Sequence, residues 1–374
     1  MGIQPQLLRQ SGTFNFDTLQ IHSNTWIPQH EFNNSIDLNR AIYGGYIDYV
    51  GSWNKINYRT GLRFEYTDQL MEIENPNYLN IFQRPTQPSY RLQKADWFPS
   101  LHVSYDIDER NSLILAASRR INRPPTKNMS PFLYRRHHEV YVVGDPALKP
   151  EYLKTAELSL IKGIGNQQLT LTGFYRGTDD AIFRANTVFE EENVLIRSYT
   201  NSGNVRALGA EINTNITAGS RARFMIGASL YDFNVQADIF GFKEDNQSTN
   251  WNVKGNMNLF LRSDLRLSID MDVRSATVTT QGQNELFYVS NAAMHYSPAR
   301  WNSWTFGLKV TDLLGSNIQG LNTRAYDATG SQIFFQQTTF DRSGPIFEFL
   351  ASYSLNTQSK QAKEGKSIFG DEQF

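Results

Sequence analysis

Cysteine is absent from the 374 residues of this sequence. The absence excludes disulfide scaffolds and thiolate metal sites, and a cysteine-free chain suits an oxidising envelope compartment. An excess of one charge is also missing, because 36 Lys and Arg oppose 37 Asp and Glu and leave a net charge of −1. Without a basic surplus nothing points to nucleic acid as a partner, and without an acidic surplus nothing points to a disordered chain.

Long apolar runs are missing too. A transmembrane helix needs about 20 apolar residues, whereas the longest uninterrupted apolar run here is Leu113–Ala117. Residues 1–12 lack the apolar stretch of a secretory signal. The mean hydropathy of −0.48 alone would indicate a soluble protein. A transmembrane β-barrel has an equally ordinary mean hydropathy, however, because its strands alternate lipid-facing and lumen-facing residues.

Catalytic motifs are absent as well. The chain contains no G-x-S-x-G nucleophile turn, no H-E-x-x-H zinc motif and no phosphate-binding loop. We therefore predict that the protein is not an enzyme, and that it has no catalytic residues, no metal site and no cofactor.

What the sequence does contain is alternation with a period of two. The clearest segment is 265–274, in which Leu, Leu, Ile, Met and Val alternate with Arg, Ser, Asp, Asp and Arg. Thirteen such strands are predicted, at 38–52, 55–69, 94–106, 111–122, 151–163, 167–178, 204–217, 221–234, 249–261, 264–275, 285–297, 301–313 and 333–355. Most have roughly a dozen residues, which favours strands that cross a bilayer, since crossing takes about 9–11 tilted residues.

The predicted connections alternate between short and long. Short turns fall at 53–54, 107–110, 164–166, 218–220, 262–263 and 298–300, and long loops at 70–93, 123–150, 179–203, 235–248, 276–284 and 314–332. Short periplasmic turns and long extracellular loops are typical of bacterial outer-membrane barrels. Aromatic residues lie near the short-turn ends, at Trp53, Tyr105, Tyr296, Trp301, Trp304 and Tyr353, where a membrane interface favours Tyr and Trp.

These patterns predict an all-β fold, a transmembrane antiparallel up-and-down β-barrel in the cell outer membrane. An odd strand count conflicts with the even counts of bacterial barrels, so residues 1–37 are interpreted as the end of an upstream strand and an extracellular loop. Residues 38–355 are then the C-terminal part of the barrel, and 356–374 a polar periplasmic tail. Alternatively, 331–344 forms a strand of its own, broken at Gly344-Pro345.

Several segments resemble the outer-membrane β-barrel family of Bacteroidetes-type TonB-dependent receptors. They are AIYGGYIDYVGSWNKINYRTGLRFEYT (41–67), WFPSLHVSYDIDERNSLILAASRRINRPP (97–125), VGDPALKPEYLKTAELSL (143–160) and NSGNVRALGAEINTNI (201–216). The resemblance implies a 22-stranded barrel, of which this chain supplies about the last thirteen strands. It also implies import of a nutrient ligand. The implied partners are outer-membrane lipid, the missing plug domain and N-terminal strands, the TonB energy-coupling complex reached through the plug, and a surface lipoprotein.

The segment 123–150 is the richest candidate for ligand contact. It contains Tyr134, Arg135, Arg136, His137 and His138, whose donors suit an anionic or metal-chelate ligand. The competing interpretation is a packed structural loop. Arg119, Arg120 and Arg123 are predicted to be architectural and to pair with acidic lumen groups, and Asp270, Asp272, Arg266 and Arg274 to pair with each other or with the plug.

Two other functions stay open at this point. The first is a non-transporting outer-membrane barrel that acts as a scaffold or as a subunit of a surface complex. A complete gene starting at Met1 would favour this alternative. A soluble glycan-binding β-protein is favoured by the 13% aromatic content but disfavoured by the strand length.

Overall fold

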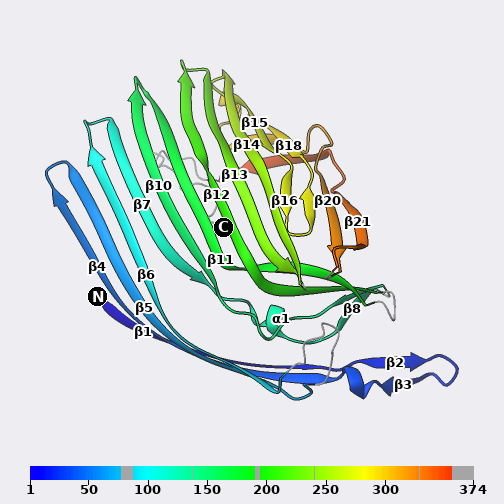
Figure 1. Cartoon of the computed structure of the whole chain (residues 1–374). Coiled ribbons are helices and arrows are strands. Elements are labelled where there is room, and N and C mark those ends of the chain that lie inside the picture. The colour runs from blue at the N-terminus through cyan, green and yellow to red at the C-terminus, as the bar shows by residue number, and fades with distance from the viewer. Residues whose placement is uncertain (77–86, 138, 190–193, 240, 328, 356–374) are drawn as a thin grey trace.

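The computed structural model contains one long, strongly curved antiparallel sheet (Figure 1). The structure describes residues 1–76, 87–137, 139–189, 194–239, 241–327 and 329–355. The main path of the sheet runs β1 (Gly2–Phe14), β4 (Asn34–Trp53), β5 (Ile56–Ile73), β6 (Ser89–Asp106), β7 (Asn111–Asn122), β10 (Glu151–Ile164), β11 (Gln167–Phe189), β12 (Val194–Ala218), β13 (Ala222–Ile239), β14 (Phe242–Arg262), β15 (Leu265–Arg274), β18 (Phe287–Tyr296), β19 (Trp304–Thr311) and β22 (Ile346–Tyr353). The predicted all-β antiparallel fold is confirmed, with β1 as a strand beyond the predicted thirteen.

Both edges of this sheet are open. Among the described residues, β1 pairs only with β4, and β22 pairs only with β19. The sheet is therefore a part of a barrel wall and not a closed cylinder (Figure 1).

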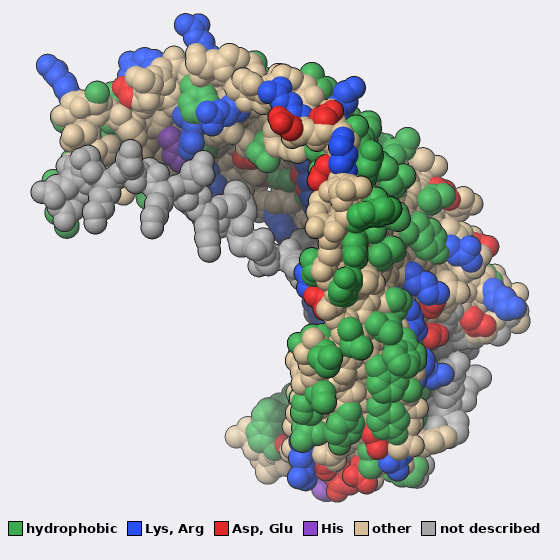
Figure 2. All heavy atoms as spheres, turned by 90° about the vertical axis from the view of Figure 1, so that its left-hand side faces the viewer, with side chains coloured by type: hydrophobic (Ala, Val, Ile, Leu, Met, Phe, Trp, Pro, Cys, Tyr) green, Lys and Arg blue, Asp and Glu red, His purple; other side chains and the backbone are tan. Residues whose placement is uncertain are grey.

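The two faces of the sheet differ as the alternation predicts. Ile212 of β12 pairs with Leu171 and Ala228, whereas its neighbour Asn213 pairs with Thr170 and Gly227. Because paired residues point to the same side, these rows form an apolar outer face and a polar inner face. Figure 2, viewed from the side on which β4 and β5 lie in Figure 1, shows a curved shell with hydrophobic side chains gathered in one patch and charged side chains at its margins.

Short turns join the strands at one end of the wall. The β4–β5 turn has Asn54 at φ 51°, the β10–β11 turn has Gly165 at φ 61°, and the β12–β13 turn has Gly219 at φ 60°. Gly and Asn adopt this left-handed conformation most readily, so the chain can reverse within a few residues. By the rule for outer-membrane barrels, this end is periplasmic and the opposite end extracellular.

The strands extend further outward than predicted. β11 has 23 residues and β12 has 25, so the predicted loop 179–203 is wrong over most of its length. Crossing a bilayer takes only about 9–11 residues, and the remainder stands outside the membrane. There both faces meet water or other protein, so the apolar alternation fades while the backbone ladder continues.

The segment 123–150 folds between these extracellular extensions. It contains α1 (Thr126–Met129), β8 (Tyr134–His137) and β9 (Val140–Val142), and β9 pairs in parallel with β12. Met129 and Leu148 join Ile36, Leu38, Met71 and Ile73 in a buried apolar cluster. Part of the segment is therefore packed against the extracellular ends of β4 and β5.

A second, four-stranded sheet lies beside the main one. It is formed by β16 (Thr277–Thr279), β17 (Gly282–Asn284), β20 (Ile318–Tyr326) and β21 (Gln332–Asp341). The predicted single strand 333–355 is therefore wrong, because its first part is β21 and only its last part, β22, joins the main sheet. The alternative that placed a separate strand at 331–344 is confirmed.

The remaining elements are small. β2 (Asp17–Gln20) and β3 (Thr25–Pro28) form an isolated hairpin, and η1 (His30–Phe32) and η3 (Ala299–Trp301) are single turns. None of the described helices is long and apolar enough to cross a bilayer.

Candidate functional site

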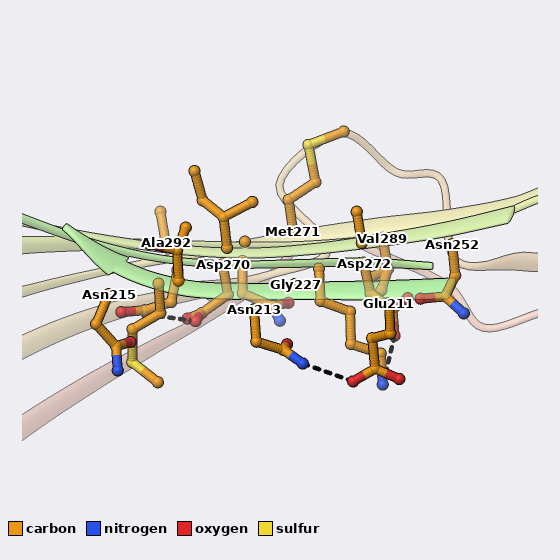
Figure 3. Close-up of a pocket in the computed structure, with 18 of the residues that line it drawn as sticks. Glu211, Asn213, Asn215, Gly227, Asn252, Asp270, Met271, Asp272, Val289 and Ala292 are labelled. Atoms are coloured by element: carbon orange, nitrogen blue, oxygen red, sulfur yellow. Dashed lines mark hydrogen bonds and ion pairs between the residues drawn. The ribbon is translucent and has the colours of Figure 1, made fainter. Parts of the chain in front are cut away.

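The concave inner face of the wall contains a hollow of about 1160 Å³. β11 to β15, β18 and β19 line it, with Glu211, Asn213, Asn215, Asn252, Lys254, Asp270 and Asp272 among the side chains. Figure 3 shows Glu211, Asn213 and Asn215 on one side of the strands and Met271 on the other. Strict alternation thus gives a polar lining from neighbouring strands that carry apolar residues outward.

Most of the charges in this hollow have partners. Asp272 lies 2.7 Å from the Arg274 guanidinium and 4.0 Å from the Lys254 ammonium. Asp270 accepts a 2.6 Å hydrogen bond from the Asn256 amide. The prediction that these lumen charges pair with each other holds for Asp272 and Arg274. Acidic and basic side chains both line the hollow, which suits it to contact with water or another polar surface.

Arg119 and Arg123, two of the three arginines predicted to be architectural, contact neighbouring strands. The Arg123 guanidinium lies 2.6 Å from Glu65, which is 5% exposed, and also donates to the Thr67 hydroxyl. Arg119 donates to the Trp97 carbonyl at 2.7 Å and lies 3.7 Å from Asp96. These contacts tie 123–150 and β7 to β5 and β6.

Arg119 acts at a gap in the wall. β6 pairs with β7 only from Ser100 to Asp106, so the extracellular half of β6 has no β7 partner. The buried Tyr152 of β10 donates a 2.9 Å hydrogen bond to Asp96 across this gap. Side chains of β7 and β10 thus contact β6 where the β6–β7 backbone ladder has stopped.

The motif around Gly144 holds 123–150 in place. The Gly144 amide donates to the Ser130 carbonyl at 3.0 Å, and a Cβ added at Gly144 would lie 2.3 Å from that oxygen. The Asp145 carboxylate caps the Ala147 amide at 2.8 Å, and Leu148 enters the buried cluster. This part of the sequence therefore holds the segment in its fold.

A second cavity, of about 690 Å³, lies at the extracellular end. We call it the basic cavity. It is lined by the end of β1, by α1 and β8 to β9 of the segment 123–150, and by the outer parts of β11 and β12. Its lining residues are Phe14, Lys127, Ser130, Phe132, Tyr134, Arg136, Val142, Gly144, Arg184, Arg197, Ser198 and Tyr199.

The basic cavity contains two of the five predicted ligand-contact residues. Tyr134 and Arg136 line it. Arg135 is not among its lining residues, and its guanidinium lies over the rings of Tyr141, at 4.8 Å, and Phe16, at 5.5 Å. Neighbouring residues of a strand point to opposite sides, which separates Arg135 from Arg136. The side chain of His137 and the whole of His138 lie outside the described residues.

Three cations of the basic cavity were missed by the sequence analysis. Lys127 comes from α1, Arg184 from β11 and Arg197 from β12. Arg184 and Arg197 stand in segments that lack apolar alternation, so no local signal marked them. Burial, and the nearby charges of Arg184 and Arg136, lower the pKa of Arg197, which lies in the extracellular extension of β12.

Metal binding by protein ligands has no support in the described part of the chain. No group of three His, Cys, Asp or Glu residues there is arranged to hold an ion.

Comparisons with known proteins bear on the whole chain. The sequence model of a family described as "Outer membrane protein beta-barrel family" matches residues 1–354. The search of curated proteins gave no match.

Solved structures of receptors share the fold. The ferric yersiniabactin uptake receptor FyuA from Yersinia pestis is 11% identical, with a TM-score of 0.58, and the match covers 90% of this chain and 49% of that one. The copper transporter OprC is 13% identical, with a TM-score of 0.58, and the match covers 93% of this chain and 53% of that one. The siderophore receptor PiuA from Acinetobacter baumannii is 11% identical, with a TM-score of 0.53, and the match covers 87% of this chain and 44% of that one. The chain thus spans about half the length of these structures, and at such identities the likeness shows the fold alone.

Proposed function

The chain belongs to the outer membrane protein beta-barrel family, and from this premise we propose that it forms the C-terminal part of the barrel wall of a TonB-dependent receptor that imports a nutrient ligand. The observation that carries the proposal is the basic cavity at the extracellular end of a wall whose inner face is polar. A ligand captured from outside would be held there before it passes along the inner face.

The open edges of the sheet support the part of the proposal that gives this chain further barrel strands as partners. In hydrocarbon each unpaired backbone group costs several kcal/mol, so spanning sheets close on themselves. The free edges of β1 and β22 therefore need further strands. The polar inner face shown in Figure 3 offers a surface for a plug domain, through which the TonB complex would act.

Ligand contact in this proposal falls to Tyr134 and Arg136, which line the basic cavity. In the same proposal Arg135, whose guanidinium lies over the rings of Phe16 and Tyr141, supports β8 and does not contact the ligand. The alternative function, a non-transporting scaffold, does not account for the basic cavity.

The test is uptake in living cells. A strain lacking this gene is compared with the parent and with a strain lacking the TonB complex, each grown on ferric chelates, glycans, peptides or cobalamin as the limiting nutrient. We expect the first strain to grow poorly on one nutrient and the TonB-deficient strain to share that defect. Normal growth of the deletion strain on every nutrient, with loss of another surface protein from the membrane, would support the scaffold instead.

A further inference from the structure

The basic cavity is charged with one sign. Four cationic side chains line it, namely Lys127, Arg136, Arg184 and Arg197, and none of the described lining residues is acidic. The chain as a whole has a net charge of only −1. This concentration of positive charge is therefore a local feature of the cavity.

The β11–β12 ladder fixes two of these cations side by side. Arg184 pairs with Tyr199 and Arg197 pairs with Asn186 two residues further along, so the four side chains share one face of the hairpin. Val142 of β9 pairs with Arg197 in parallel, which places the β8–β9 hairpin, with Arg136, beside β12 as a continuation of the same sheet. The cations thus come from separate segments and are held by backbone pairing.

Among the residues that the structure describes, these cations have no anionic partner. Arg197 donates a 2.9 Å hydrogen bond to the Gln336 amide oxygen, which is neutral. In the described part of the chain, no carboxylate is found within 4.0 Å of Lys127, Arg136, Arg184 or Arg197. Like charges held together in a partly buried site repel each other, and a bound anion would relieve that repulsion.

Aromatic rings form the other part of the lining. Phe14 and Phe132 stack with their centroids 5.7 Å apart and their planes at 17°, and Tyr134 and Tyr199 add two phenol rings. Flat apolar rings favour contact with a planar ligand, and guanidinium groups bind carboxylate or phosphate through paired hydrogen bonds.

We propose that the basic cavity binds small planar polyanions, molecules with two or more carboxylate or phosphate groups on an aromatic or conjugated frame. Arg136, Arg184 and Arg197 bind the anionic groups, and the ring system lies against Phe132 and Tyr134. The role of this binding in import rests on the proposed function, whereas the binding itself does not.

The experiment measures binding of trimesate, a flat benzene tricarboxylate, to the protein in outer-membrane vesicles. The neutral triamide of the same ring is the matched control ligand. We expect trimesate to bind with a Kd below about 1 mM. Its binding should weaken as the salt concentration rises, because salt screens the charges. The triamide should bind at least about tenfold more weakly, since it lacks the charges that give strong hydrogen bonds to guanidinium.

Variants then locate the site. Arg184→Gln and Arg197→Gln should each weaken trimesate binding by about tenfold or more, and Arg197→Lys should restore part of it. Arg221→Gln, in the periplasmic β12–β13 turn, is the matched arginine control and should bind like the native protein. Heat-modifiable migration on gels confirms that each variant is folded.

The outcomes separate the inference from the proposed function. If native protein fails to bind trimesate, or if Arg184→Gln and Arg197→Gln bind it normally, the polyanion site is wrong even where uptake depends on the gene. If trimesate binds as described while the growth test shows no uptake defect, the polyanion site stands and the import function falls.

Discussion

Asn186 and Gln281 form a buried pair between residues 95 positions apart in the sequence. The Asn186 backbone nitrogen donates to the Gln281 side-chain oxygen at 2.7 Å, and the Gln281 side-chain nitrogen donates to the Asn186 backbone carbonyl at 2.9 Å. The pair joins the extracellular part of β11 to the connection between β16 and β17. It thereby fixes the second sheet against the wall, close to the hairpin that carries Arg184 and Arg197.

Gln281→Ala should loosen this connection. The change leaves buried donors and an acceptor of Asn186 without partners, at about 1–3 kcal/mol for each unsatisfied group. We expect faster hydrogen exchange and protease cleavage in 277–284, with the membrane part unchanged. Gln283→Ala, at an exposed position on β17, is the control, and equal protection of the two variants would contradict the prediction.

Glu65→Ala should destabilise the protein far more than the loss of an exposed ion pair. Glu65 is buried between Arg63, at 2.5 Å, and Arg123, at 2.6 Å. Removing one member of a buried ion pair leaves uncompensated charge and costs about 3–5 kcal/mol. Urea unfolding followed by heat-modifiable migration measures the change.

Asp48→Ala is the matched control for Glu65. Asp48 pairs with Arg59 at 2.8 Å, but the Arg59 side chain is 67% exposed. Exposed ion pairs contribute about 0–1 kcal/mol, so this variant should unfold nearly as the native protein does. Similar losses for Glu65→Ala and Asp48→Ala would show that burial of Glu65 is not important.

Ile212→Lys should impair membrane insertion while Asn213→Lys is tolerated. Ile212 faces outward in register with Leu171, and Asn213 faces the hollow, where its amide donates to Glu211 at 2.6 Å. A lysine on the lipid face near the bilayer midplane costs about 2–4 kcal/mol. The readout is the fraction of protein that resists urea extraction from outer membranes. Equal resistance of both variants would contradict the assignment of the two faces.

Two carboxylates outside the membrane should respond to pH in opposite directions. Burial raises the pKa of Glu244, near the tip of the β13–β14 hairpin, above its usual value of 4.5. The folded state then binds a proton more tightly than the unfolded state, so stability falls as pH rises from the unfolded pKa through the folded one. Glu244→Gln should therefore protect the hairpin near pH 7 and have little effect below pH 4, as measured by hydrogen exchange.

Asp327, in the β20–β21 connection, provides the opposite case. Hydrogen bonds from the Thr329 side chain and from the Ser331 and Thr329 amides lower the pKa of Asp327 below 3.8. The stabilisation it gives is present above the unfolded pKa and is lost as pH falls through the folded one. Asp327→Asn should loosen this connection near pH 7 but not under strongly acidic conditions. Identical pH profiles for the two variants would refute both assignments.

The sequence by itself determined the strands of the membrane part, their apolar outer face and their short turns. Segments such as 265–274 show these features because alternation and turn chemistry depend on neighbours along the chain. It also determined the architectural role of Arg123, through a motif that resembles a known family.

Only the tertiary structure decided where the strands end and which cations meet. β11 continues past residue 178 and β12 begins before residue 204 because backbone pairing, not alternation, holds them outside the bilayer. β21 pairs with β20 and not with the main sheet. Arg136, Arg184 and Arg197 line one cavity because the β8–β9 hairpin pairs with β12, where the partners Val140 and Leu195 are 55 positions apart in the sequence. Pairing at that distance leaves no mark in a local pattern, so the basic cavity exists only in the folded chain.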